Sequence, residues 1–292
     1  MDVSVIIVSY QSAAHVRDCL ASAQAQEGIQ SEILVVDNAS SDDTAGVVRN
    51  LGQGVTLLAN RDNLGFGRAC NQGFAASRGR FIYFLNPDAQ LVQSDALARL
   101  GRALEDHPRW GMAGTRILSV EGQIVSPPAT SYPGQFHTRN DFARLPGQIA
   151  WVLGASMFFR REVFAALGGF DPDFFLHSEE TDLCLRLRQQ GYEIGLVDDV
   201  AVRHIGGASE QRRDPYEVWR QRMDGLHRFW KKHYLPEDAA RLVRRDRRRA
   251  RFRMLWNGGL AWLQPPHSKH WQKHRRYRAI WEASTFFLAK QP

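Results

Sequence analysis

Apolar residues in the first third of the chain form short unbroken runs, separated by longer segments with a mixed pattern. The runs are typical of buried strands, and they lie at residues 3–8, 33–36, 55–59 and 81–85. The segments between them predict helices at residues 13–26 and 43–50, and another beyond residue 67. Because strand and helix alternate, the pattern predicts a mostly parallel sheet with crossover helices.

Proline and glycine interrupt every regular pattern between residues 123 and 147. A loop of that length is usually a lid, a binding loop or disordered, and a lid would close over a ligand. After it, the pattern predicts strands at 151–159 and 193–197, an extended segment at 200–203, and helices at 162–167 and 179–190. Apolar residues then recur at helical spacing from Tyr216 to Trp230, which predicts a helix packed on a globular core.

Two of the predicted strands end in a carboxylate. Pro87 ends the run at 81–85, so Asp88 lies at the carboxyl end of a buried strand, and Asp37 ends the run at 33–36. Open α/β sheets bind ligands at this edge. Asp88 could hold a divalent cation and, through it, a phosphate, although an aspartate after proline is also an ordinary turn residue.

Glu179 and Glu180 open the helix predicted at 179–190, after Ser178 as an N-cap. Acids are favoured in a first helical turn, which alone explains them, but a carboxylate at this position can also act as a general base. His204 ends the extended segment at 200–203. An imidazole is usually structural, but with a carboxylate and diphosphate oxygens it would suit Mg²⁺ or Mn²⁺.

Residues 63–71 contain a glycine-rich stretch, Asn63-Leu64-Gly65-Phe66-Gly67, that only superficially resembles a dinucleotide fingerprint. Cys70 stands where the third glycine belongs, and the stretch follows the third strand rather than the first. A flexible loop that lets backbone approach a ligand is the better interpretation.

Composition is that of a globular protein, with 43% hydrophobic and 24% charged residues, but the charge is unevenly distributed. Residues 241–292 carry 14 Lys and Arg against two acids, a net charge of +12, and the rest of the chain carries −5. The arginines from Arg241 to Arg253 surround the predicted helix on all sides, next to Trp256, Trp262 and Trp271. Such a tail indicates a polyanionic partner, either an anionic membrane or a nucleic acid, unless it is only a solvated helix.

Three widely spaced cysteines without a CxxC pair favour reduced thiols in a cytoplasmic protein. The first strand begins at once, so no signal peptide is expected, and no apolar run is long enough to span a bilayer.

In order and spacing, these segments resemble the family 2 glycosyltransferases of the GT-A fold, especially bacterial rhamnosyltransferase-like members. The matching pieces cover about residues 1–210 and include Val35-Val36-Asp37-Asn38, Leu85-Asn86-Pro87-Asp88 and Phe175 to Arg186. The resemblance implies one mostly parallel sheet flanked by helices. Residues 1–105 would form a Rossmann-like nucleotide-sugar half and 106–210 an acceptor half, with 211–292 as a basic helical extension.

The resemblance also implies transfer of a sugar, with inversion, from a nucleoside diphosphate donor to a saccharide or lipid-linked saccharide acceptor in cell-surface polysaccharide synthesis. Deoxythymidine-diphosphate rhamnose is the expected donor, ahead of uridine-diphosphate hexoses. The residues implied to bind the nucleotide sugar are Ser9, Tyr10, Asp37, Asn63, Asn71, Asn86 and Asp88. Asp88 and His204 would ligate Mg²⁺ or Mn²⁺, and Glu180, with Glu179 as second choice, would be the base.

This sequence departs from the family pattern at two positions. The metal-binding element is Asn86-Pro87-Asp88 in this chain. Asn86 replaces the first of the family's two acids and Asp88 is the second, so metal affinity would depend heavily on the diphosphate. The usual glutamate–aspartate pair is Glu179-Glu180. A non-catalytic nucleotide-sugar binder and a nucleic-acid-binding protein are the alternatives, although nucleic acid would be repelled by the acidic globule. If the chain is a glycosyltransferase, the basic tail is expected to attach the protein peripherally to the cytoplasmic face of the plasma membrane.

Overall fold

The structure is a computed structural model that describes residues 1–51, 54–206, 213–262 and 268–289. It divides into two compact units. The first comprises Met1–Tyr132, Arg144–Phe175 and Glu179–Ser209, and the second comprises Pro133–Ala143, Leu176–Ser178 and Glu210–Pro292. The domain boundary expected after residue 210 lies outside the described residues.

The first unit is built on a single sheet, which contains eight strands within the described residues. They are β1 (Val3–Ser9), β2 (Ser31–Asp37), β3 (Val55–Ala59), β4 (Phe81–Leu85), β5 (Ala89–Leu91), β6 (Trp110–Leu118), β7 (Ser156–Arg160) and β8 (Glu193–His204). Their order is β3-β2-β1-β4-β7-β6-β8-β5, and only β7 and β5 oppose the common direction. The expectation of a mostly parallel α/β sheet is confirmed.

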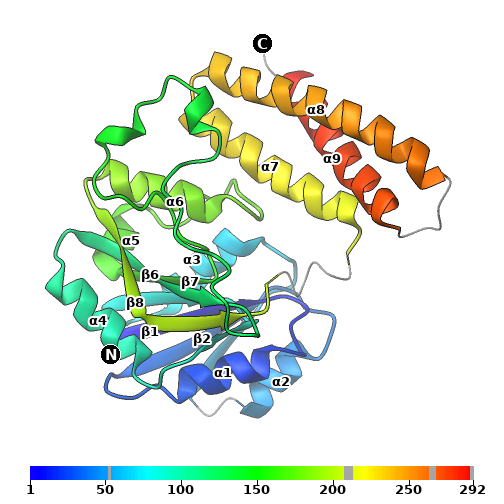
Figure 1. Ribbon diagram of the computed structural model, residues 1–292. Helices are drawn as coiled ribbons and strands as arrows, with labels where there is room; N and C mark the ends of the chain where they lie inside the picture. The colour runs from blue at the N-terminus through cyan, green and yellow to red at the C-terminus, as the bar shows by residue number, and fades with distance from the viewer. Residues whose placement is uncertain (52–53, 207–212, 263–267, 290–292) are drawn as a thin grey trace. The chain divides into compact units, whose positions relative to one another are not determined.

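Helices cover both faces of this sheet (Figure 1). One face packs on α1 (Val16–Gln24), α2 (Thr44–Leu51) and α4 (Ala96–Asp106), and the other on α3 (Phe66–Ala76), α5 (Arg161–Ala166) and α6 (Glu179–Gln189). In β1, Val5 and Ile7 face α1 while Ile6 and Val8 face α3. Because both faces are buried, the strands read as unbroken apolar runs rather than as alternating patterns.

The structure differs from the expected elements around the middle of the sheet. The strand expected from residue 151 begins only at Ser156, and Trp151 forms no more than an isolated bridge with Ala129. The elements β5, α4 and β6 were not anticipated. Strand β5 has three residues and pairs with β8, more than a hundred residues later, so its own sequence holds no local signal.

The second unit contains three long helices, α7 (Pro215–His233), α8 (Pro236–Trp262) and α9 (Lys269–Ala289) (Figure 1). Helix α9 packs along both α7 and α8. The helix expected from Tyr216 onward is confirmed, with Met223 and Trp230 buried. The side of α8 that bears Leu242, Val243 and Ala250 is buried, so the arginines cover its outer side instead of surrounding it.

The segment between β6 and β7 contains two short 3₁₀ helices, η1 (Gln135–His137) and η2 (Phe142–Arg144). Within the second unit, the carbonyl oxygen of Pro133 accepts hydrogen bonds from Trp230 Nε1 at 2.8 Å and from the Tyr234 hydroxyl at 2.7 Å. The irregular stretch expected at residues 123–147 is therefore held in place by side chains at its middle.

Candidate active site

Asp88 and His204 lie side by side at the carboxyl end of β4. Strand β5 follows Asp88 directly and pairs antiparallel with the last residues of β8, with Ala89 opposite His204. His204 Nε2 lies 3.1 Å from Asp88 Oδ1 and 3.5 Å from Asn86 Nδ2. Both side chains of the close pair are only 11% exposed. The pairing of β5 with β8 therefore places an imidazole on the expected strand-end carboxylate.

The surroundings of Asp88 favour its ionised form. Burial alone would raise the pKa of this carboxyl, but the hydrogen bond and the charge of His204 outweigh burial and hold the pKa below its usual range. The charge of His15 adds to this effect. His15 is the N-cap residue of α1 and is half-buried. It was missed from the sequence, where the only signal is its place at the start of the first helix after β1.

Asp37 is a buried carboxylate held by hydroxyl groups. Ser9 Oγ donates to Asp37 Oδ1 at 3.2 Å, and Ser40 donates to Asp37 from its Oγ at 2.6 Å and from its backbone N–H at 3.3 Å. Ser9 stands opposite Asp37 in the β1–β2 register and is fully buried, whereas Tyr10 is exposed. Ser9 thus fixes the orientation of the Asp37 carboxylate through its hydrogen bond. Of Ser9 and Tyr10, only Tyr10 is exposed.

Asn38 organises the turn that precedes α3. Its side-chain oxygen accepts from the backbone N–H of Leu64 at 3.0 Å, and its amide donates to Asn63 Oδ1 at 2.8 Å. Gly65, the next residue of the turn, has φ of +86°, and a Cβ there would meet the Phe175 carbonyl oxygen at 2.4 Å. Only glycine fits this close approach to the backbone of Phe175. The approach of this loop to a ligand stays a prediction.

The amide of Asn71 is bound on both sides by one backbone residue. Its Nδ2 donates to the Phe170 carbonyl at 2.8 Å, and its Oδ1 accepts from the Phe170 N–H at 2.9 Å. These bonds fix the segment before α6 to α3. Asn63 also holds backbone, because its Oδ1 accepts a hydrogen bond from the N–H of Gly65.

The two glutamates at the start of α6 have different surroundings. Glu179 is 5% exposed, and its Oε2 has no hydrogen-bond partner among the described residues. Burial, and next the charge of Glu180, raise the pKa of Glu179 well above its usual range, which favours its protonated form. Glu180 is half-buried and accepts a hydrogen bond from Thr181 Oγ1 at 3.2 Å.

Residues 154 and 155 connect the two halves of the candidate site. The backbone N–H of Asn86 donates to the Ala155 carbonyl at 3.0 Å. A Cβ built on Gly154 would lie 3.6 Å from the Cβ of Glu180. The segment between them therefore touches both the strand end that bears Asp88 and the helix start that bears Glu180.

Arg188 anchors part of the irregular segment within the first unit. Its guanidinium donates to the carbonyl oxygens of Pro146 at 2.9 Å and Gly147 at 2.9 Å, and to the Tyr132 hydroxyl at 3.1 Å. Arg188 lies on α6, the same helix that begins with the two glutamates. Tyr132 and the last residues of the segment are thus tied to the helix that bears the candidate base.

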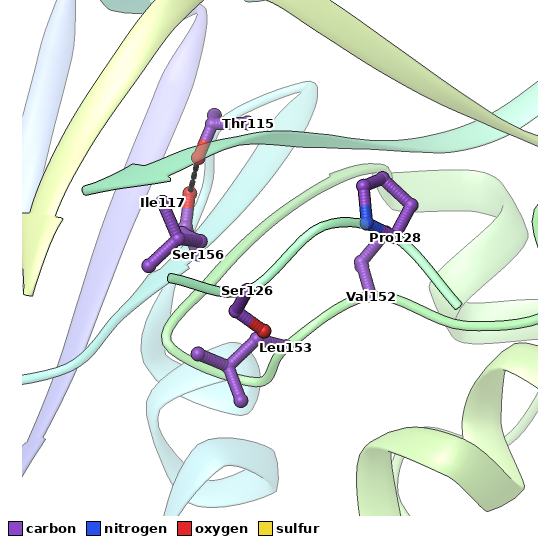
Figure 2. A pocket seen from close by; sticks show the side chains of 7 residues that line it. All are labelled: Thr115, Ile117, Ser126, Pro128, Val152, Leu153 and Ser156. Carbon is purple, nitrogen blue, oxygen red and sulfur yellow. Dashed lines mark hydrogen bonds between the residues drawn. The ribbon is translucent and has the colours of Figure 1, made fainter. Parts of the chain in front are cut away.

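Figure 2 shows a small cavity beside β6 and β7. It is lined by Thr115, Ile117, Ser126, Pro128, Val152, Leu153 and Ser156. Its volume of about 10 Å³ is at the lower limit for one water molecule. Thr115 Oγ1 donates to Ser156 Oγ at 2.8 Å, and the Tyr83 hydroxyl lies 2.8 Å from the same oxygen, so its polar wall is already satisfied. The cavity is too small for a sugar.

The residues at Asp88 fit a divalent cation that also has non-protein ligands. The described residues contain no cluster of three or more His, Cys, Asp or Glu side chains that could hold a metal by themselves. The 3.1 Å between Asp88 Oδ1 and His204 Nε2 nevertheless matches the separation of roughly 3 Å between adjacent ligands of an octahedral Mg²⁺. Two protein ligands leave room for diphosphate oxygens and water.

The three cysteines, Cys19, Cys70 and Cys184, are free and buried. Burial raises the pKa of each thiol, that of Cys184 to about 12. None of them therefore competes as a nucleophile or as a metal ligand at neutral pH.

Comparison with known proteins identifies relatives of this chain. The model of glycosyl transferase family 2 matches residues 4–168, which include Asp37 and Asp88. An uncharacterized protein of Mycobacterium tuberculosis is 32% identical over 227 residues, which cover 72% of this chain and 69% of that protein. The N-acetylglucosaminyl-diphospho-decaprenol L-rhamnosyltransferase of the same species is 28% identical over 242 residues, which cover 72% and 78%.

Solved structures show the same fold. A mannosyltransferase from Pyrobaculum calidifontis, in complex with GDP-mannose and Mn²⁺, has a TM-score of 0.61 at 20% identity and covers 99% of this chain and 88% of its own. Staphylococcus aureus TarS 1–349 with UDP-GlcNAc has a TM-score of 0.55 at 15% identity, with 100% and 93% covered. The sheet described above is thus that of the GT-A glycosyltransferases, and the chain belongs to glycosyl transferase family 2.

Proposed function

We propose that this glycosyltransferase moves a sugar, with inversion, from a nucleoside diphosphate donor to a saccharide or lipid-linked saccharide in cell-surface polysaccharide synthesis. The observation that carries the proposal is the pairing of Asp88 with His204 at the carboxyl end of β4. Rhamnose carried by deoxythymidine diphosphate is the first choice of donor, because two curated relatives are named rhamnosyltransferases.

The nucleoside would bind at the ends of β1 and β2. The carboxylate of Asp37 is fixed by Ser9 and Ser40, so it presents an oriented acceptor to the hydroxyl or N–H groups of a nucleoside. Tyr10 is exposed beside it and offers a ring to the base. Asn63 and Asn71 would support the same site through the backbone that they hold.

Asp88 and His204 would hold Mg²⁺ or Mn²⁺ together with the donor diphosphate. When bound, the ion supplies positive charge against the charge that develops on the leaving diphosphate. Asn86 lies within 3.5 Å of His204 and would orient that imidazole toward the same group.

Glu180 is the proposed base. The raised pKa of the buried neighbour Glu179 makes it less suited to accept a proton at neutral pH in its present surroundings. Glu180 is half-buried at the start of α6 and would accept the proton of the acceptor hydroxyl. Closure of the segment at residues 123–147 over the donor would exclude water and limit hydrolysis.

A donor panel tests the proposal. Thermal shift and product formation are measured for nucleoside diphosphate sugars with Mg²⁺ or Mn²⁺, on the wild type, on Asp88→Asn and on the control Asp95→Asn, a surface acid paired with Arg99. A transferase loses turnover in Asp88→Asn but not in the control. If no nucleoside diphosphate sugar stabilises the wild type with metal present, the proposal fails. Donor binding without turnover in the wild type would identify a non-catalytic binder.

The second unit has a surface suited to an anionic membrane. Along α8, exposed arginines and exposed apolar side chains share one outer face, about a third of the helix circumference at 100° per residue. This outer face consists of Arg241, Arg244, Arg245, Arg248, Phe252, Leu255, Trp256 and Trp262. Trp262 is 88% and Phe252 72% exposed. None of the described helices is long and apolar enough to cross a bilayer. We therefore infer peripheral attachment, at the cytoplasmic face where lipid-linked acceptors would be reached.

Sedimentation with phosphatidylglycerol vesicles tests this attachment against retention on duplex DNA. Replacing Arg244 and Arg248 by Gln removes about 1 kcal/mol per charge of attraction to the vesicles. A variant with Trp256→Ala and Trp262→Ala loses vesicle binding but keeps any binding to DNA. The matched control, Arg17→Gln with Arg61→Gln, leaves both unchanged. Retention on DNA without vesicle binding would support the nucleic-acid alternative instead.

A further inference from the structure

Three arginines from three helices meet around two aromatic rings in the second unit. Arg276 of α9 stacks on Trp219 of α7, with its Cζ 3.7 Å from the ring centroid, and Arg222 lies 5.2 Å from the same ring. Arg276 and Arg253 lie 5.6 and 5.4 Å from the centroid of Tyr277. Arg253 Nη1 also donates to the Tyr277 hydroxyl at 2.8 Å. The two rings therefore hold three guanidinium groups as neighbours.

Arg276 is a cation in unfavourable surroundings. Burial lowers its pKa, and the positive charges of Arg222 and Arg253 lower it further, with only Tyr277 acting in the opposite direction. Within the described chain, no carboxylate is among the groups that shift it. The Nε of Arg276 is buried and has no hydrogen-bond partner among the described residues. Among the described residues, the Nε donor of Arg276 therefore has no acceptor, although two further guanidinium groups lie close to it.

Neighbouring arginines on α9 are treated differently. Arg275 donates from its Nε to Asp214 at 3.1 Å, and Arg278 donates from its Nε to Glu282 at 2.8 Å. The fold thus supplies a carboxylate to the arginines on either side of Arg276. This contrast indicates that the guanidinium of Arg276 binds an anion from outside the protein rather than a carboxylate of the chain itself.

The chemistry of that anion follows from the three guanidinium groups. All three side chains are half-buried, so a ligand can still reach them. Planar guanidinium forks bind phosphate oxygens in pairs, and several of them suit an anion with more than one negative charge. We propose that Arg222, Arg253 and Arg276 form a binding site for a phosphate or diphosphate group, either free or carried on a lipid headgroup. The site does not depend on the proposed transfer reaction.

The test uses the full chain in metal-free buffer, where the donor site lacks its proposed ion. Binding of inorganic pyrophosphate is followed by thermal shift and calorimetry in the wild type, in Arg276→Met and in the control Arg278→Met. Methionine retains an apolar contact with Trp219 but removes the charge. We expect Arg276→Met to bind pyrophosphate roughly 10- to 100-fold more weakly, since a charge-assisted bond is lost, and Arg278→Met to bind like the wild type.

The melting temperature without anion then distinguishes a ligand-binding role of Arg276 from a purely structural one. Without anion and at low salt, Arg276→Met should melt at or above the wild-type temperature, because removal of one cation relieves repulsion. If Arg276→Met melts lower and pyrophosphate binds it unchanged, Arg276 only packs on Trp219 and the proposal is overturned. Absence of any binding by the wild type, to pyrophosphate and to vesicles alike, would also overturn it.

The source of the phosphate is distinguished with vesicles of equal charge. Phosphatidic acid carries a phosphomonoester, whereas phosphatidylserine carries a diester. Preference for phosphatidic acid vesicles that disappears in Arg276→Met assigns the site to a lipid headgroup. Pyrophosphate binding that depends on Arg276, without such a preference, assigns it to a free phosphate or diphosphate.

Discussion

The assignment of a protonated Glu179 next to an ionised base can be tested by isosteric substitution. Glutamine has the shape of a neutral glutamic acid, so Glu179→Gln changes little in the folded state when the native side chain carries a proton. Glu180→Gln removes the group that must accept a proton. The two adjacent substitutions should therefore differ in activity, with a small change for Glu179→Gln and a large loss for Glu180→Gln, and Glu179→Gln should also change the pH dependence of stability.

The magnitude for Glu179 follows from its burial. Its pKa in the folded state is raised above the usual value of about 4.5, so the stability it contributes is complete below that value and is lost as the pH rises toward the folded pKa. Each pH unit in this window costs the wild type about 1.4 kcal/mol. Between pH 5 and pH 7 the unfolding free energy of Glu179→Gln should therefore rise relative to that of the wild type, by at most roughly 3 kcal/mol for one proton over two pH units.

The assay is urea denaturation of both proteins at pH 5, 6 and 7, since titrating groups that do not interact with Glu179 cancel in the difference. Activity is measured on the same samples. Glu179→Gln should keep turnover within a few fold of the wild type, and Glu180→Gln should lose about 10²- to 10⁴-fold. A free-energy difference that stays constant from pH 5 to pH 7 would refute a protonated Glu179. Loss of turnover in Glu179→Gln but not in Glu180→Gln would reverse the assignment of the base.

Three further predictions concern the supports of the site. Arg186→Met, which deprives buried Asp182 of its 2.8 Å ion pair, should lower the unfolding free energy by about 3–5 kcal/mol in urea, and an unchanged midpoint would contradict this. Asn71→Leu should lower it by about 1–3 kcal/mol with little change in donor KM, since its amide bonds only Phe170; a raised KM at unchanged stability would instead place Asn71 on the donor. His204→Ala should raise the metal concentration for half-maximal activity at least tenfold, and an unaltered metal dependence would remove His204 from the ligand set.

The sheet was predictable from the sequence where each strand carries its own signal. The runs that became β1, β2 and β4 are buried on both faces, so their apolar character is continuous and their carboxyl ends could be located to within one residue. Strand β5 could not be found in this way. Its three residues are strand-like only because β8 supplies the hydrogen bonds, and that partner is distant in sequence.

The candidate site likewise has features that the sequence could predict and features that it could not. Asp37 and Asp88 were identified because a strand end is a local property, whereas the approach of His204 to Asp88 depends on β5. His15 was missed because its effect on Asp88 acts through space. The difference between Glu179 and Glu180 was also invisible in the sequence, since adjacent residues on a helix point in different directions and only the packing on α3 decides which one is buried.

The order of the strands in the sheet has a consequence for synthesis on the ribosome. The strands β1 to β4 are adjacent in sequence and in space, so this half can form early, but the free side of β4 is covered only by β7, whose residues emerge some seventy positions later. Until then the apolar edge at Phe81–Leu85 is open to pairing with other chains. The Asp88–His204 pair is complete only after β8 has been made. A truncated chain that ends before residue 156 would therefore leave this edge exposed, and one that ends before residue 204 would lack the proposed metal ligand His204.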